Sequence, residues 1–154
     1  MEKENTTTIK GEILLGIIFA LELYALPMQF YLLLQGDGFT FLSAAVRFFS
    51  FFTITTNCIV FICTAMLLFG GKNAMNAFFR KCTTITAITV YILIVGIVFN
   101  LLLRSIVDLQ GHHSIVSEIF HVVVPILFFF YCLFFVSPEK ISCKTIWFWL
   151  LYPI

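Results

Sequence analysis

The stretch from Cys82 to Leu103, CTTITAITVYILIVGIVFNLLL, decides the fold class of this protein. It carries no charged residue, and apolar residues and threonines fill most of its positions. A helix that crosses roughly 30 Å of hydrocarbon needs about 20 mostly apolar residues. Strands of membrane β-barrels instead alternate polar and apolar residues over about ten positions, which this stretch does not do. It is therefore predicted to be a membrane-spanning helix.

The rest of the chain has the same character. Of its 154 residues, 61% are hydrophobic and 11% are charged, and the mean hydropathy is +1.06. A soluble domain carries about 25% charged residues. We therefore predict an all-α fold, a polytopic helical membrane bundle in a single domain with membrane lipid as its partner. The net charge of +1 gives no reason to expect nucleic acid. The four full spans are predicted at 13–34, 44–69, 82–103 and 115–136.

A fifth apolar run, TIWFWLLYPI, occupies residues 145–154. A helix of about ten residues rises only about 15 Å, half of the hydrocarbon thickness. Ending there would leave a carboxylate and several helical carbonyls in the bilayer without hydrogen-bond partners. We expect this run to be a truncated fifth span of a longer parent protein. The alternative is a segment that lies at the membrane surface.

The basic residues predict the orientation of the spans, because cytoplasmic loops are enriched in lysine and arginine. With four spans, seven of the nine basic residues fall on the side of the N-terminus. Only Arg47 and Arg104 fall on the other side. We therefore expect a protein of the cell membrane with its N-terminus in the cytoplasm.

Polar residues gather near the predicted outer ends of the second and third spans. Ser50, Thr53 and Asn57 follow one another at steps of three and four, so in a continuous helix they share one face. The third span presents Asn100 and Arg104, which are one helical turn apart. We expect these two groups to lie at similar depths in the bilayer.

The fourth span adds Glu118 and His121, three residues apart at its outer end. Polar residues inside a membrane are costly and are often functional. We predict an outward-facing intramembrane pocket lined by Thr53, Asn57, Asn100, Arg104, Glu118 and His121. Taken singly, each residue also fits a structural role, as an interhelical hydrogen bond or as an arginine that reaches the interface.

Two further features suggest chemistry less strongly. Glu22 lies near the middle of the first span, where an ionised carboxylate is costly. Glu22 could be a neutral, hydrogen-bonded carboxyl group or a site that carries protons, and the sequence leaves both interpretations open. The segment from His112 to His121 holds three histidines and Glu118, but His112 and His113 are adjacent. Zinc ligands on a helix are usually spaced to share one face, so we expect no metal or other cofactor.

Five motifs appear in order along the chain: MQFYLLL, RFFSFFTITTNCIVF, VGIVFNLLLR, FHVVVPILFFFYCLFF and FWLLYPI. In these motifs the chain resembles the bacterial Pr6Pr family of multi-spanning membrane proteins, most of which have no assigned function. Members typically continue beyond the last motif through a further span. The resemblance therefore implies a membrane protein of unassigned function and a longer parent chain.

The Pr6Pr family is distantly similar to the eukaryotic androgen-induced membrane proteins, which are intramembrane hydrolases of fatty-acid esters. That similarity implies a threonine nucleophile at Thr53, after the FF pair, and a histidine base at His121, before VVVP. The substrate would be a lipid ester, and Asn57, Asn100 or Arg104 could stabilise the oxyanion. Two alternatives stay open: a purely structural bundle or complex subunit, and a small transporter that uses Glu22.

Overall fold

The computed structural model describes residues 2–36, 40–107, 109–137 and 149, with side chains from residue 9 onward. Long helices separated by short connections account for most of these residues, and no strand occurs among them. The helices are α1 (Glu2–Leu34), α2 (Phe41–Ser50), α3 (Phe52–Phe69), α4 (Ala74–Phe79), α5 (Cys82–Val98), α6 (His112–Glu118) and α7 (Val124–Phe135). Two π-helical turns, η1 (Phe99–Leu103) and η2 (Ile119–Val123), continue α5 and join α6 to α7.

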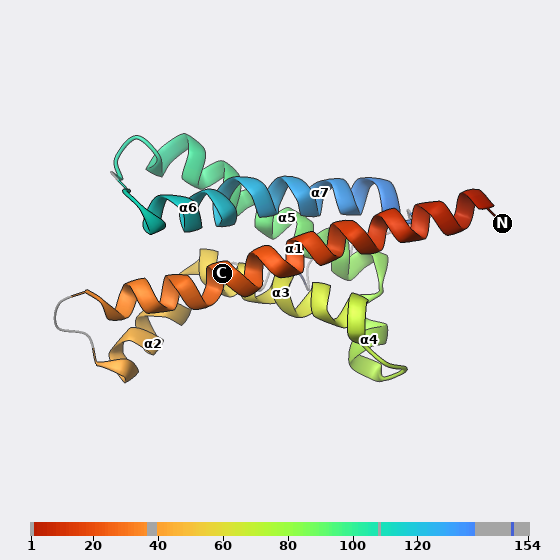
Figure 1. Cartoon of the computed structure of the whole chain (residues 1–154), viewed down its shortest axis with the longest axis horizontal. Helices are drawn as coiled ribbons and strands as arrows, with labels where there is room; N and C mark the ends of the chain where they lie inside the picture. Colours follow the sequence, from red (N-terminus) through yellow and green to blue (C-terminus); the bar gives the residue numbers. More distant parts are fainter. Residues whose placement is uncertain (1, 37–39, 108, 138–148, 150–154) are drawn as a thin grey trace.

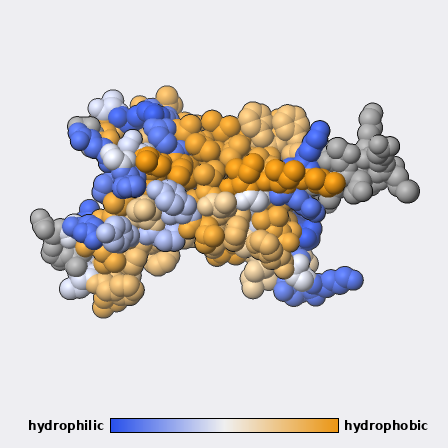
Figure 2. Space-filling model, in the orientation of Figure 1, coloured by the Kyte–Doolittle hydropathy of each residue, from blue (hydrophilic) through white to orange (hydrophobic). Residues whose placement is uncertain are grey.

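Four helical segments are long and apolar enough to cross a membrane, which confirms the predicted all-α membrane bundle. They are Ile9–Leu34, Phe52–Phe69, Cys82–Leu103 and His112–Phe135. Figure 2 shows hydrophobic residues across the middle of the visible face and hydrophilic residues gathered toward its two ends. The predicted partial span at 145–154 lies outside the described residues except for Trp149, whose ring lies 5.9 Å from that of Phe78.

Helix α1 runs along the length of the bundle and packs against α3 and α7, while α5 packs against α3 and α7 (Figure 1). The core between them is mainly apolar, and stacked rings such as Phe19 on Phe61, 5.0 Å apart, fix α1 against α3. We call the end with the α1–α2 and α5–α6 connections the histidine end, after His112 and His113. The opposite end, with the α3–α4 connection and Arg80, is the basic end.

The predicted second span at 44–69 is not one helix, which corrects the expected boundary. Phe51 is extended, with φ −86° and ψ 123°, and it separates α2 from α3. The Ser50 hydroxyl donates to the Val46 carbonyl at 2.6 Å. Serine side chains that bond back in this way compete with the helical ladder and bend helices. Only the α3 part is long enough to span, and Ser50 no longer continues the helical face of Thr53 and Asn57.

Candidate functional site

The strongest candidate site is a pocket of about 310 Å³ at the histidine end, between α1, the start of α3, η1 and η2. We call it the threonine–histidine pocket. Most of its wall is apolar, with Phe51 and Ile54 near the start of α3 and Leu103 and Val107 near the end of η1. Its polar lining consists of Gln29, Thr53, His113, Ser117 and His121. A concave apolar pocket with a few polar groups is typical of a site for a small molecule or a lipid.

The backbone around His121 is irregular because of Pro125, four residues further along. Proline has no N–H, so the His121 carbonyl lacks its usual helical donor, and the proline ring crowds that carbonyl. Helix α6 widens there into the π-helical turn η2, a feature that is frequent at functional sites. The Asn100 side-chain amide supplies the missing donor, with Nδ2 3.0 Å from the His121 carbonyl oxygen.

Gly96 allows this contact between α5 and η2. A Cβ atom at residue 96 would lie 2.9 Å from the His121 carbonyl oxygen and 3.3 Å from Cβ of Pro125. Any larger residue would therefore push the two spans apart. The small residue, the proline and the asparagine together fix the position of His121.

The His121 ring is held on two sides. Its Nδ1 lies 2.8 Å from the Ser117 carbonyl oxygen and 3.3 Å from the Ser117 hydroxyl. The Phe99 ring stacks on it with a centroid distance of 3.8 Å and an interplanar angle of 19°. A carbonyl oxygen only accepts hydrogen bonds, so we assign the proton to Nδ1. In the neutral ring Nε2 is then an acceptor, which is the form that a general base needs.

Thr53 lies in the first turn of α3, two residues after the extended Phe51. Its carbonyl accepts a hydrogen bond from Nδ2 of Asn57 at 2.7 Å, whereas no described residue hydrogen-bonds its hydroxyl group. Thr55 differs, because its hydroxyl donates back to the Phe51 and Phe52 carbonyls. No hydrogen bond joins Thr53 to His121 among the described residues, but both side chains line the threonine–histidine pocket.

The other predicted site residues do not line this pocket. Asn57 is fully buried in α3, and its Oδ1 has no hydrogen-bond partner among the described residues. Asn100 and Arg104 line a second pocket of about 420 Å³, which His121 also borders. Arg104 donates to Oδ1 of Asn100 at 2.5 Å and forms a salt bridge with Glu118. Apart from the buried Asn57, the predicted polar residues therefore form two groups, Thr53 with His121 and Asn100 with Arg104 and Glu118, and His121 borders both pockets.

Sequence reasoning missed three polar residues of the threonine–histidine pocket. Ser117 precedes His121 by four residues, so helical spacing alone places it on the same face. Gln29 interrupts an apolar run in α1, a signal of the kind that drew attention to Glu22. His113 was considered only as a metal ligand. Among the described residues, no group of three or more His, Cys, Asp or Glu side chains could hold a metal ion.

Glu22 lies elsewhere, in the core between the spans. Its side chain is fully buried, and neither carboxyl oxygen has a hydrogen-bond partner among the described residues. It lines neither of the two pockets that His121 borders.

Comparison with known proteins adds no relative. No family model, curated protein or solved structure matches the chain. Membership of the Pr6Pr family stays a prediction that depends on the five motifs.

Proposed function

We propose that the protein is an intramembrane hydrolase of lipid esters and that the threonine–histidine pocket is its active site. The proposal is based on one observation: Thr53 and His121 line the same mainly apolar pocket. A threonine hydroxyl is a weak nucleophile until an adjacent base accepts its proton. His121, with Nδ1 held by the Ser117 carbonyl, has Nε2 available as that base.

The reaction follows from these two groups. The Thr53 hydroxyl oxygen attacks the ester carbonyl carbon while its proton passes to Nε2 of His121. The bond to the alcohol oxygen then breaks, and the alcohol leaves with the proton from Nε2. Water next attacks the acyl group on Thr53, its proton passes through Nε2 to the threonine oxygen, and the fatty acid is released.

Catalysis requires Thr53 and His121 to approach to about 2.6–3.2 Å between Oγ1 and Nε2. Such hydrogen bonds are often longer without substrate and tighten when it binds. The extended Phe51, at the start of α3, is a position that can adjust Thr53 without unwinding a spanning helix. Substrate binding is thus expected to complete the pair.

The oxyanion needs a hydrogen-bond donor on the pocket wall. Asn100 and Arg104, two of the donors predicted from the sequence, already bond to other groups and line the second pocket. Gln29 lines the threonine–histidine pocket, and no described residue hydrogen-bonds its amide. Gln29 is therefore the better donor in this proposal.

The substrate class follows from the pocket wall and the membrane setting. Phe51, Leu103 and Val107 provide an apolar surface beside the polar groups, which suits an acyl chain next to its ester. In the orientation proposed from the seven-to-two split of basic residues, the histidine end faces the outside and the N-terminus lies in the cytoplasm. The substrate would then be an ester in the outer half of the bilayer.

Hydrolysis of a panel of long-chain acyl esters by the purified protein in detergent tests the proposal. Thr53→Val and His121→Gln should each lower the rate by about 10²-fold or more, because each removes one member of the catalytic pair. Thr55→Val and His112→Gln are matched controls, since neither residue lines the pocket. Activity that survives both pocket variants, or no hydrolysis of any ester by the unmodified protein, would contradict the proposal.

A further inference from the structure

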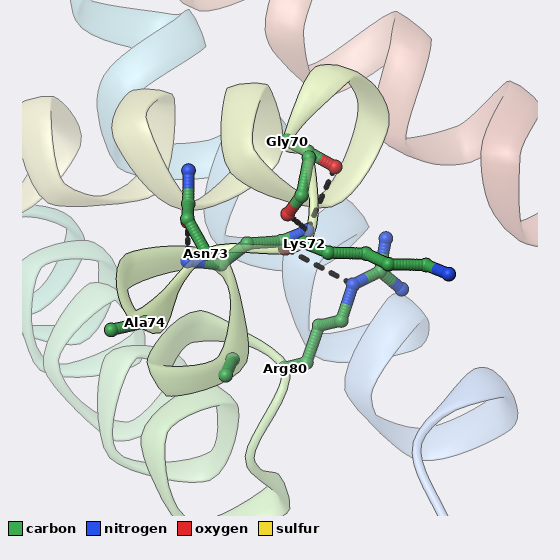
Figure 3. Close-up of a pocket in the computed structure, with 8 residues that line it drawn as sticks. Gly70, Lys72, Asn73, Ala74 and Arg80 are labelled. Atoms are coloured by element: carbon green, nitrogen blue, oxygen red, sulfur yellow. Dashed lines mark hydrogen bonds between the residues drawn. The ribbon is translucent and has the colours of Figure 1, made fainter.

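A third pocket, with different chemistry, lies at the basic end, where the connection from α3 leads into α4. It is an open pocket of about 640 Å³ lined by residues from Gly70 to Arg80, and no carboxylate lines it. Figure 3 shows the side chains of Lys72 and Arg80 extending to the same side of this loop. We call it the lysine–arginine pocket. Lys72 and Arg80 are the two cations that line it, and such a lining favours a negatively charged ligand.

The guanidinium of Arg80 is held in place rather than free in solvent. Its Nε donates to Oδ1 of Asn76 at 3.0 Å, and Nη2 donates to the Leu67 carbonyl at 3.1 Å. These bonds go to neutral acceptors, and Arg80 makes no ion pair among the described residues. Glu12 lines a neighbouring pocket with Arg80, but no salt bridge joins the two among the described residues. Nη1 of Arg80 therefore remains available to a ligand.

Asn76 organises the loop around this arginine. It is 6% exposed, and its Nδ2 donates to the carbonyls of Gly70 at 2.8 Å and Gly71 at 2.7 Å. A Cβ atom at residue 70 would lie 2.3 Å from the Met66 carbonyl oxygen, so only glycine fits there. The side-chain amide of Asn76 thus fixes the conformation of the loop, because it bonds both to the end of α3 and to Arg80.

The surroundings of this loop lead us to expect it at the membrane interface. It connects two spanning helices, α3 and α5, and three large apolar side chains beside it are exposed: Phe69, Met75 and Phe78. In a bilayer these side chains would contact lipid, while Lys72 and Arg80 would lie at the level of the headgroups.

We propose that the lysine–arginine pocket binds the phosphate of an anionic phospholipid headgroup. Arginine binds phosphate through its planar set of N–H donors, and lysine adds a mobile point charge. The exposed apolar residues beside the pocket favour a lipid over a soluble anion, because they would contact the acyl chains of the same molecule. This site is independent of the hydrolase proposed above and lies at the opposite end of the bundle.

Binding of headgroup-labelled phosphatidylglycerol, with the protein in phosphatidylcholine nanodiscs, tests this inference. Lys72→Gln and Arg80→Gln should each weaken binding roughly five-fold, the effect expected for one basic residue near an anionic surface. Arg80→Lys should recover only part of the loss, because it keeps the charge but not the planar donors. Lys81→Gln is the matched control, since Lys81 is exposed in the same connection but does not line the pocket.

Three results would overturn the inference. An equal loss with Lys81→Gln would mean that the loop attracts anionic lipid through its total charge. Displacement of the lipid by inorganic phosphate at comparable concentration would identify a soluble anion as the ligand. Lys72 lies in an exposed loop, so Lys72→Gln is expected to fold. Unchanged binding of phosphatidylglycerol by this variant would exclude the pocket as the lipid-binding site.

Discussion

Two polar regions within the membrane spans differ in whether their side chains have hydrogen-bond partners. Around η1 and η2, the side chains of Asn100, Arg104 and His121 each have hydrogen-bond partners. Midway along the bundle, Glu22 and Asn57 are fully buried, yet both Glu22 oxygens and Oδ1 of Asn57 have none among the described residues. Both regions consist of polar residues in apolar runs, so composition alone does not separate them.

The difference comes from the backbone rather than from the side chains. Pro125 removes the donor for one carbonyl, and Gly96 lets the neighbouring span approach closely enough to replace it. Helix α1 also contains a proline, Pro27, but between residues 17 and 34 it has no glycine that would let a neighbouring span approach as closely. Helix α3 contains neither proline nor glycine. The role of a polar residue in a membrane span therefore depends on whether a neighbouring backbone carbonyl lacks its helical donor.

Adding a methyl group at the closest approach of the spans should have the largest effect. In Gly96→Ala the new Cβ would lie 2.9 Å from the His121 carbonyl oxygen, so we expect a loss of about 3 kcal/mol in the free energy of unfolding. Gly16→Ala is the matched control, because nothing lies within 4 Å of its added Cβ. Unfolding in detergent, followed by tryptophan fluorescence, measures both. Equal stability of the two variants would mean that the spans do not need this close contact.

Replacing Glu22 with an apolar residue of similar size should stabilise the protein. Glu22→Met removes two buried oxygens without partners, and we expect a gain of about 2 kcal/mol in the free energy of unfolding. Glu12→Met, at an exposed position on the same helix, serves as the control. A large loss of stability in Glu22→Met would show that the carboxyl group has a partner or a bound ligand.

Replacing each of the two asparagines in the membrane spans with leucine should lower the free energy of unfolding by different amounts. Asn100→Leu leaves the His121 carbonyl without its donor and should cost about 1 kcal/mol. Asn57→Leu should cost less, because Asn57 bonds only to a carbonyl one turn back in its own helix and leaves Oδ1 unpartnered. The same unfolding measurement in detergent compares them. A greater loss of stability in Asn57→Leu than in Asn100→Leu would contradict the difference proposed between the two regions.

The smallest effect is expected at the Arg104–Glu118 salt bridge. The two side chains are 49% and 41% exposed, and exposed ion pairs contribute less than about 1 kcal/mol. Glu118→Gln should therefore change stability only slightly. Any loss should fall as salt concentration rises, since salt screens exposed charges. A salt-independent loss larger than that of Asn100→Leu would place this pair among the main stabilising contacts.

The sequence was sufficient to predict the fold class but not every boundary. Long uncharged runs such as Cys82–Leu103 determine spanning helices, because length and apolarity are the physical requirements. The break at Phe51 could not be predicted, since FFSFFT contains neither glycine nor proline. It depends on a serine hydroxyl that competes with the helical ladder, and a serine in a helix usually does not have that effect.

For the site, the sequence placed polar residues at one end of the bundle but could not show how they divide. Thr53 lines one pocket and Asn100 and Arg104 line the other, whereas His121 borders both. Gln29 was missed although it interrupts an apolar run, because its place on the pocket depends on which face of α1 meets α3, η1 and η2. Which faces of neighbouring helices meet depends on tertiary packing, which a single sequence does not contain.

The most direct measurement is mass spectrometry of the purified protein after incubation with an activated long-chain acyl ester. An acyl group on the peptide that contains Thr53 is the predicted result, because the proposed reaction passes through an ester of that hydroxyl. The label should be absent in Thr53→Val, strongly reduced in His121→Gln and unchanged in Thr55→Val. A peptide without label, or a label that persists in Thr53→Val, would contradict the assignment of Thr53 as the nucleophile.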